Sequence, residues 1–333
     1  MKHLWKGAVA VAFATGLNMV PAQAQEARLA YVPVESHPVG QAVNRFAELV
    51  KEKSEGRINV QTFPGGSLGN EPQTQSSLSG GFLEMMVGPT SNLVGAVPEF
   101  GIFDLPFFYP SFEAVDAVMD GPVGDKLFKR LEDIGIVGLA YWDNGFRHMT
   151  NAVRPINTVE DIKGLKIRVI PNPLFIKTFE AVGANPVPLP YPELYNALES
   201  GTVEAQETPV GLTYSDKFYE VTKYLTLTGH VYSPYVLLAS KSWFDGLNEA
   251  DQAIIKEAAA ETEPYQRGLS RDAADNIANV KLVEEGLEVT TLPPEEQQKL
   301  RDMVAPVIEE FSGSIGADLV EEAREDIKAA TAE

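Results

Sequence analysis

Short apolar runs alternate with amphipathic helical patterns along most of this chain, and this alternation limits the folds that it can adopt. The segment 164–183 shows the pattern most clearly. Residues 166–169 alternate basic and apolar side chains, which predicts a short strand with one buried face. Asn172 then stands at a helix N-cap position, and residues 173–182 carry apolar side chains at helical spacing. Such strand and helix pairs indicate an α/β protein with a mostly parallel sheet that is covered on both faces.

The pattern occurs in two successive parts of the chain. One part ends near residue 145, and the pattern starts again after Arg147. Beyond Trp243 the sequence becomes helical and charged almost to its end. The 333 residues of the chain are enough for two ordinary domains. We therefore expect two α/β lobes joined by crossing segments, with a helical C-terminus.

The first 24 residues have the features of a secretory signal peptide. Lys2 and Lys6 precede an apolar run over residues 8–17, and the segment ends in Ala-Gln-Ala. The run is too short to span a bilayer comfortably, and no other stretch of the sequence is long and apolar enough to do so. We therefore expect cleavage near Ala24 and a soluble mature protein that is exported to the periplasm.

The overall charge and the lack of cysteine exclude several kinds of site. The chain carries 27 basic and 47 acidic residues, a net charge of −20, which opposes non-specific binding of nucleic acid. It contains no cysteine, which excludes disulfides, thiolate catalysis and cysteine-ligated zinc. His37, His148 and His230 form no helical i, i+4 pair, so a histidine metal site has little support, although an ion held by carboxylates stays open. We expect no cofactor.

Arg168 is the main candidate for ligand binding that the local pattern offers. It lies on a predicted strand that leads into a helix, and open α/β sheets bind small ligands in the crevice beyond such strand ends. A planar guanidinium matches a carboxylate through two parallel hydrogen bonds. A solvated arginine, or one paired with a surface carboxylate, would give the same sequence pattern. Our hypothesis is that Arg168 holds an organic acid.

An ordered set of motifs along the mature chain resembles the solute-binding proteins of tripartite ATP-independent periplasmic (TRAP) transporters, of the dicarboxylate-binding DctP type. In chain order the motifs are LGNE at 68–71, FDLP at 103–106, YWDNGFR at 141–147, GLKIRV at 164–169, GANPVP at 183–188, ELYNAL at 193–198 and QETP at 206–209. No single motif is decisive, but their order over nearly the whole mature chain is specific.

The resemblance implies a two-lobed, flytrap-like receptor of the periplasmic-binding-protein kind, without enzymatic activity. Such a receptor closes on a small organic acid and delivers it to the small and large membrane subunits of a TRAP permease. The resemblance also divides the mature chain into lobe I, residues 25–145 with about 233–272, and lobe II, residues about 146–232 with 273–333. A receptor that signals to a partner protein would use the same cleft.

The same resemblance implies a set of ligand-binding residues. In the family, the arginine of the GLKxR motif forms a bidentate salt bridge with the substrate carboxylate, and Arg168 occupies that position. The arginine after WDNGF, here Arg147, lies close to the same pocket in relatives and often assists. The other positions that the resemblance places around the cleft are Val32, Pro89, Asn172, Tyr191 and Thr208.

One departure from the family pattern bears on the substrate. Thr208 stands where the family usually carries an asparagine that meets the ligand. C4-dicarboxylates, sugar acids and small hydroxy or keto acids all offer the carboxylate that Arg168 would bind. Two arginines among several polar positions suit a ligand with more than one polar group, so the sequence favours a C4-dicarboxylate or a sugar acid.

A secreted α/β serine hydrolase is the alternative to a receptor. The loop Gly65-Gly66-Ser67-Leu68-Gly69 matches the GxSxG nucleophile motif, and His148 or His230 follows it in the required order. However, Pro64 precedes the loop and the strand before it is polar, whereas a nucleophile elbow needs a buried strand that runs straight into a helix. A polar turn explains the motif more simply.

Overall fold

The computed structural model describes residues 25–332, and the signal peptide expected over residues 1–24 lies outside this range. Within it, the strands are β1 (Gln25–Ala30), β2 (Ile58–Phe63), β3 (Met85–Pro89), β4 (Ile136–Asn151), β5 (Lys166–Val169), β6 (Asn185–Pro188), β7 (Ala205–Pro209), β8 (Tyr224–Leu227), β9 (Tyr232–Ser240) and β10 (Glu288–Thr291). They follow the order β2-β1-β3-β9-β4-β7-β5-β6, while β8 pairs with β4 and β10. The fold is therefore mixed α/β, as the sequence predicts.

The long strand β4 connects the two lobes. Its first part pairs with β9 in lobe I, and its last part pairs with β7 and β8 in lobe II. The outer strands of each lobe are parallel to their neighbours, as expected. In contrast, β4 and β9 are antiparallel to theirs, because one strand carries the chain out of lobe I and the other brings it back. The sheet is thus less parallel at its centre than the sequence predicts.

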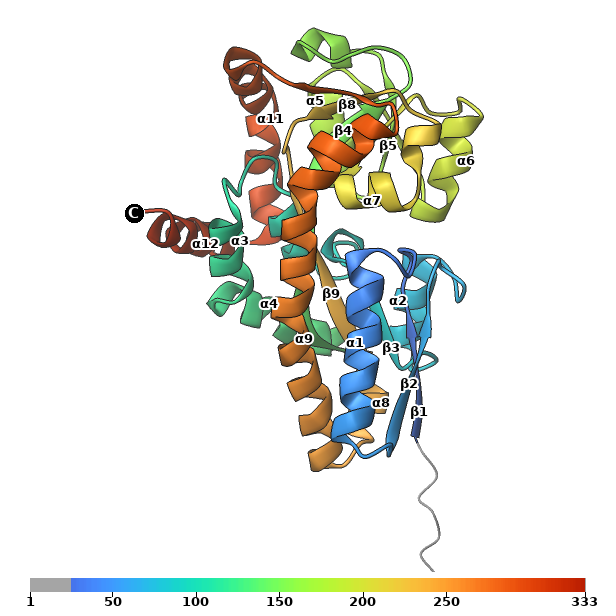
Figure 1. Cartoon of the computed structure of the whole chain (residues 1–333). Coiled ribbons are helices and arrows are strands. Elements are labelled where there is room, and N and C mark those ends of the chain that lie inside the picture. The colour runs from blue at the N-terminus through green and yellow to red at the C-terminus, as the bar shows by residue number, and fades with distance from the viewer. Residues whose placement is uncertain (1–24, 333) are drawn as a thin grey trace, which may run out of the picture.

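Helices cover the sheet on both faces (Figure 1). In chain order they are α1 (Pro38–Lys53), α2 (Glu71–Ser79), α3 (Phe112–Met119), α4 (Pro122–Leu131), α5 (Pro173–Ala181), α6 (Leu194–Glu199), α7 (Val210–Ser215), α8 (Lys241–Asp245), α9 (Glu249–Asn276), α10 (Leu282–Glu284), α11 (Pro294–Ile315) and α12 (Ala317–Ala330). Successive side chains of β3 point to opposite faces of the sheet and so pack into two different cores. Met85 and Val87 face the core beneath α1 and α9, whereas Met86 faces the core beneath α3 and α4.

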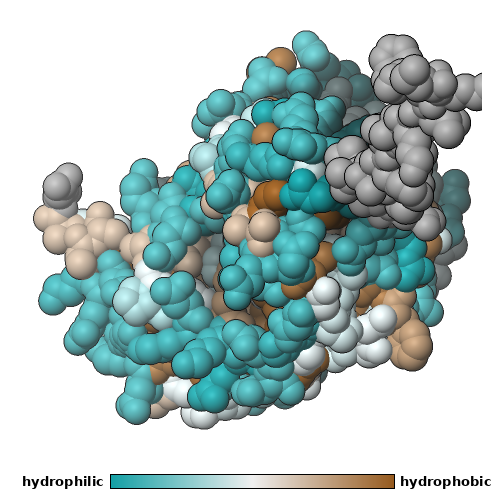
Figure 2. Space-filling model, turned by 90° about the horizontal axis from the view of Figure 1, so that it is seen from below, coloured by the Kyte–Doolittle hydropathy of each residue, from teal (hydrophilic) through white to brown (hydrophobic). Residues whose placement is uncertain are grey.

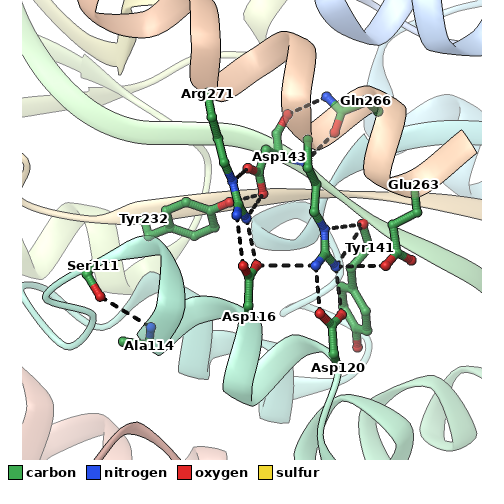
Figure 3. Close-up of polar contacts among 11 residues, drawn as sticks. Ser111, Ala114, Asp116, Asp120, Tyr141, Asp143, Tyr232, Glu263, Gln266 and Arg271 are labelled. Atoms are coloured by element: carbon green, nitrogen blue, oxygen red, sulfur yellow. Dashed lines mark hydrogen bonds and ion pairs between the residues drawn. The ribbon is translucent and has the colours of Figure 1, made fainter. Parts of the chain in front are cut away.

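The long helix α9 lies beside α1 in lobe I and reaches the level of lobe II (Figure 1). Asn248 caps its start, and the helix continues through Pro264. Arg267 and Arg271 fasten α9 to α3, where Arg271 Nη1 donates to Asp116 Oδ2 at 2.8 Å and Arg267 Nη1 donates to Asp120 Oδ2 at 2.7 Å (Figure 3). A π-helical turn over Ile277–Lys281 follows the helix and contacts α7 of lobe II.

The C-terminal helix α12 packs against α3 and α4, at the left of Figure 1. The division implied by the resemblance assigns residues 273–333 to lobe II. Because α12 contacts helices that belong to lobe I, we propose that residues 317–330 move with lobe I instead.

The face of the molecule drawn in Figure 2 is mainly hydrophilic. Figure 2 shows the end of the molecule seen from below, where apolar residues form only separate patches. The large apolar side chains that are exposed within residues 25–332 are Leu68, Phe82, Val153, Tyr265, Val280 and Val283. Among the helices of this range, none has the length and apolar character needed to cross a membrane.

Candidate ligand site

A small cavity of about 30 Å³ lies between the two lobes. Side chains from α2 and β3 of lobe I, from β5 and β7 of lobe II and from the crossing strand β4 line it. Five of the seven residues that the sequence nominates surround this cavity, namely Pro89, Arg147, Arg168, Tyr191 and Thr208. Val32 and Asn172 are not among its lining residues.

Arg168 is buried and has unused hydrogen-bonding capacity. Residues 167–169 of β5 are all buried, so the guanidinium lies inside the molecule rather than on an open strand face. Its Nε donates to the Leu189 carbonyl oxygen at 2.9 Å, and its Cζ lies 5.6 Å from the centre of the Tyr191 ring. Its Nη1 is buried without a hydrogen-bond partner among residues 25–332. Burial lowers the pKa of Arg168 to about 10, against the opposing effect of Glu207, so the group stays charged at neutral pH.

Arg147 has a fixed partner, which the sequence did not predict. Its Nε and Nη2 both bond to the carboxylate of Glu207, with Nη2 donating to Oε1 at 2.8 Å. Both side chains are buried, and His230 Nε2 lies 3.2 Å from Glu207 Oε2. Burial alone would raise the pKa of Glu207, but Arg147 and His230 lower it below its ordinary value. The charge of Arg147 is therefore already balanced within the protein.

Glu71 brings a carboxylate into the cavity, and the sequence nominated it only as part of a motif. It is the first residue of α2, where Asn70 accepts a hydrogen bond from the Gln73 amide and Gln73 bonds back to Asn70. This capping box fixes Glu71 at the cavity wall, and the side chain is almost fully buried. Burial raises the pKa of Glu71, while its own helix turn and the charge of Arg168 oppose the rise.

The hydroxyl groups of two nominated residues bond to nearby protein groups. The Tyr191 hydroxyl donates to Asp216 Oδ2 at 2.8 Å, so its ring stays beside Arg168 as a wall of the cavity. Thr208 is buried, and its Oγ1 lies 3.3 Å from the hydroxyl oxygen of Thr213. The Thr208 side chain is thus held by a hydrogen bond within lobe II.

Asn172 has a structural task that explains its absence from the cavity. Its Oδ1 accepts from the Leu174 amide at 2.9 Å, which confirms the predicted N-cap of α5. Its Nδ2 donates to Asp104 Oδ2 at 2.7 Å and to the Ser91 carbonyl at 3.1 Å. Both ends of the amide are therefore engaged in joining α5 to lobe I.

Asp104 is a second buried carboxyl group near the site. Its Oδ1 accepts from the Ser91 hydroxyl at 2.6 Å, and Asn172 bonds to its other oxygen. Burial raises the pKa of Asp104 to about 7, although Ser91, Arg147 and Asn172 oppose this. The FDLP motif includes Asp104, but a sequence motif does not indicate that its carboxyl group has a raised pKa.

Histidine chemistry has no support in the geometry. His148 Nδ1 accepts from the Gly229 amide at 3.0 Å, and His230 bonds to Thr228 and Glu207. Neither ring is therefore hydrogen-bonded to Ser67, which is exposed on its loop. Within residues 25–332, no group of three or more histidine, aspartate or glutamate side chains is placed to hold a metal ion.

Comparisons with known proteins match this chain to bacterial solute-binding proteins. The sequence model of the bacterial extracellular solute-binding proteins, family 7, matches residues 29–314. The chain is 37% identical to the 2,3-diketo-L-gulonate-binding periplasmic protein YiaO of Escherichia coli K12 over 268 residues, 80% of this chain and 81% of YiaO. It is 30% identical to the C4-dicarboxylate-binding periplasmic protein DctP of Rhodobacter capsulatus over 332 residues, 98% of each chain.

A solved structure gives the same result. The sugar acid binding protein DctPAm of Advenella mimigardefordensis, in complex with galactonate, superposes with a TM-score of 0.91 at 40% identity. The match covers 93% of this chain and 99% of DctPAm. The two-lobed architecture is thus shared over nearly the whole described chain.

Proposed function

Because this chain belongs to family 7 of the bacterial extracellular solute-binding proteins, the non-enzymatic receptors of TRAP transporters, we propose that it carries a small organic acid anion to the small and large membrane subunits of a TRAP permease. Members of this family are periplasmic binding proteins, and a cleaved signal peptide over residues 1–24 would bring this chain to the same compartment. The serine hydrolase alternative is wrong for a member of this family.

The observation that carries the proposal is the buried Nη1 of Arg168, which lacks a partner among residues 25–332. A buried charge without a hydrogen-bond partner is costly. A ligand carboxylate would remove that cost through charge-assisted hydrogen bonds, each worth about 1.5 to 3 kcal/mol. Since groups of both lobes line the cavity, this gain favours the closed form over an open one.

The charges around the cavity favour a monoanion. Arg147 is balanced by Glu207, which leaves Arg168 as the cation available to a ligand. The Glu71 carboxyl lies beside it, and burial raises its pKa and so favours the neutral form. A second ligand carboxylate would be buried without a second available cation, which is costly, whereas ligand hydroxyls can bond to the Glu71 carboxyl. We therefore place a polyhydroxylated monocarboxylate, a sugar acid, before a C4-dicarboxylate. The galactonate bound by DctPAm and the 2,3-diketo-L-gulonate named for YiaO support this order, and the DctP of Rhodobacter capsulatus supports the alternative.

A thermal-shift and calorimetric screen of the purified protein tests the proposal with galactonate, 2,3-diketo-L-gulonate and succinate. At one hundred times the dissociation constant, a ligand adds about 2.7 kcal/mol to the free energy of unfolding, which is a shift of several degrees. We expect at least one of these acids to bind, and Arg168→Met to weaken it at least about a hundredfold. Arg45→Met, which changes a surface arginine of α1, is the matched control. No binding, or equal loss in both variants, would reject Arg168 as the anchor.

A further inference from the structure

The strand β4 contains a β-bulge beside the ligand cavity. Asp143 pairs with Pro234 and Gly145 pairs with Ser233, so Asn144 is the additional residue between two regular pairs. Gly145 follows with a φ of 116°, a backbone conformation that favours glycine. A bulge of this kind turns a side chain away from the regular alternation of a strand, and bulges are frequent next to binding sites.

Both the backbone and the side chain of Asp143 are held by hydrogen bonds, which come from Tyr232, Gln266 and Arg271. The Asp143 amide donates to Gln266 Oε1 at 2.6 Å, and Gln266 Nε2 donates to the Asp143 carbonyl at 2.7 Å. Its buried carboxylate accepts from Tyr232 Oη and from Arg271 Nε. Figure 3 shows Arg271 and Gln266 reaching Asp143 from the same helix. The backbone that precedes Asn144 is thus fixed by α9.

Asn144 has an unused acceptor and lines the ligand cavity. The residue is 5% exposed and lines the same cavity as Arg168 and Glu71. Its Oδ1 is buried without a hydrogen-bond partner among residues 25–332, and such a group destabilises the protein unless a donor reaches it. Asn144 also lines a larger cavity of about 390 Å³ that Arg271 lines too, so the residue lies between the ligand cavity and α9.

We infer that Asn144 binds a hydroxyl group of the ligand, and that Arg271 acts as its positioning residue through Asp143. The inference rests on the proposed function, and it makes the ligand class more specific. An amide oxygen accepts a hydrogen bond from a hydroxyl but cannot accept one from a second ionised carboxylate. The bulge residue therefore selects hydroxylated acids over dicarboxylates.

The first experiment compares galactonate with the five galactonate analogues that each lack one hydroxyl, titrated into the wild-type protein and into Asn144→Leu. We expect Asn144→Leu to bind galactonate about tenfold more weakly. For one analogue, the wild-type and variant proteins should bind equally, because the hydroxyl that Asn144 recognises is missing. If the variant weakens all analogues by one common factor, or weakens none, the role of Asn144 is wrong.

The second experiment separates positioning from stability. Arg271→Met should reproduce the selective pattern of Asn144→Leu with a smaller factor of about threefold, and Arg271→Lys should restore part of it. The control is Arg267→Met, because Arg267 bonds to Asp116, Asp120 and the Tyr141 carbonyl but not to Asp143. Arg267→Met should lower the melting temperature without changing the pattern among analogues. A uniform loss for Arg271→Met would overturn the positioning role.

The outcomes also separate this inference from the proposed function. If galactonate binds through Arg168 and ignores Asn144, only the hydroxyl-binding role fails. If succinate binds and galactonate does not, the receptor remains but selection for hydroxyls is wrong. If none of the acids binds, the proposed function itself fails.

Discussion

Two regions of this molecule hold an arginine side chain partly or fully buried, Arg271 partly and Arg168 fully, and they treat the positive charge differently. Where α9 meets α3, all three guanidinium nitrogens of Arg271 bond to the carboxylates of Asp116 and Asp143. Between the lobes, Arg168 has one bond to a backbone carbonyl and a buried Nη1 without a partner among residues 25–332. The guanidinium of Arg271 thus completes its hydrogen bonds within the protein, whereas the guanidinium of Arg168 keeps a donor free for a ligand.

The difference shows how buried charge can be assigned to structure or to binding. A paired and fully bonded charge is expensive to break, since removal of one partner leaves the other uncompensated. An unsatisfied charge destabilises the empty protein and stabilises the complex, so its removal should affect binding rather than folding. Arg147 and Arg168 line the same cavity and allow this distinction to be tested within one site.

The largest effect is expected for Arg147→Met. This change leaves the Glu207 carboxylate buried with His230 as its remaining partner, and breaking a buried pair costs about 3 to 5 kcal/mol. Urea unfolding should show that loss in the free energy of unfolding. The double variant Arg147→Met with Glu207→Met should recover most of it, because both charges are then gone. A single variant as stable as the wild type would show that the pair is not a structural one.

The next effect concerns Asp104 and pH. Burial raises its pKa to about 7, whereas the unfolded chain loses this proton near pH 4. Between these values the folded state holds one more proton, so stability should fall as pH rises. Urea unfolding at pH 5 and pH 8 should show that the wild type loses about 3 kcal/mol more than Asp104→Asn over this interval. Equal losses would mean that Asp104 is already ionised at pH 5.

A smaller effect is expected for Glu71→Gln. Burial favours the neutral carboxyl of Glu71, and the neutral amide of glutamine has nearly the same shape and still accepts a hydrogen bond from a ligand hydroxyl. Calorimetry should therefore show galactonate and succinate each changed by less than about threefold. Succinate bound about tenfold more tightly would mean that Glu71 is ionised in the folded protein and repels a second carboxylate. Glu48→Gln, at an exposed position of α1, is the control. Weaker binding of both acids would place Glu71 in a structural role.

The smallest change in stability is expected for Arg168→Met. Replacing a buried, unsatisfied charge by an apolar side chain should leave the free energy of unfolding of the ligand-free protein within about 1 kcal/mol of the wild type. Urea unfolding without ligand measures this directly. A loss of about 3 kcal/mol, as expected for Arg147→Met, would remove the contrast between the two arginines.

The sequence predicts local structure well where neighbouring residues decide it. Alternation over residues 166–169 and the cap at Asn172 locate β5 and the start of α5 correctly, and the ordered motifs identify the family. The pairing of Arg147 with Glu207 could not be read in this way, since the two residues are 60 positions apart and meet only across β4 and β7.

The bulge at Asn144 and the packing of α12 could not be predicted from the sequence, for a similar reason. A bulge is an irregularity in pairing with β9, and pairing partners are not visible in a local pattern. The WDNGF motif nevertheless held the signal, because an asparagine beside glycine in an apolar strand marks an irregular backbone. For α12, amphipathic spacing predicts a helix but not which lobe its apolar face covers.

The most direct test of the central claim is a crystal structure of the protein with galactonate, or with whichever acid of the screen binds most tightly. We predict the ligand carboxylate within about 3 Å of Arg168 Nη1, with the Arg147 and Glu207 pair intact beside it. A carboxylate bound elsewhere, with Arg168 Nη1 still unpartnered, would contradict the account.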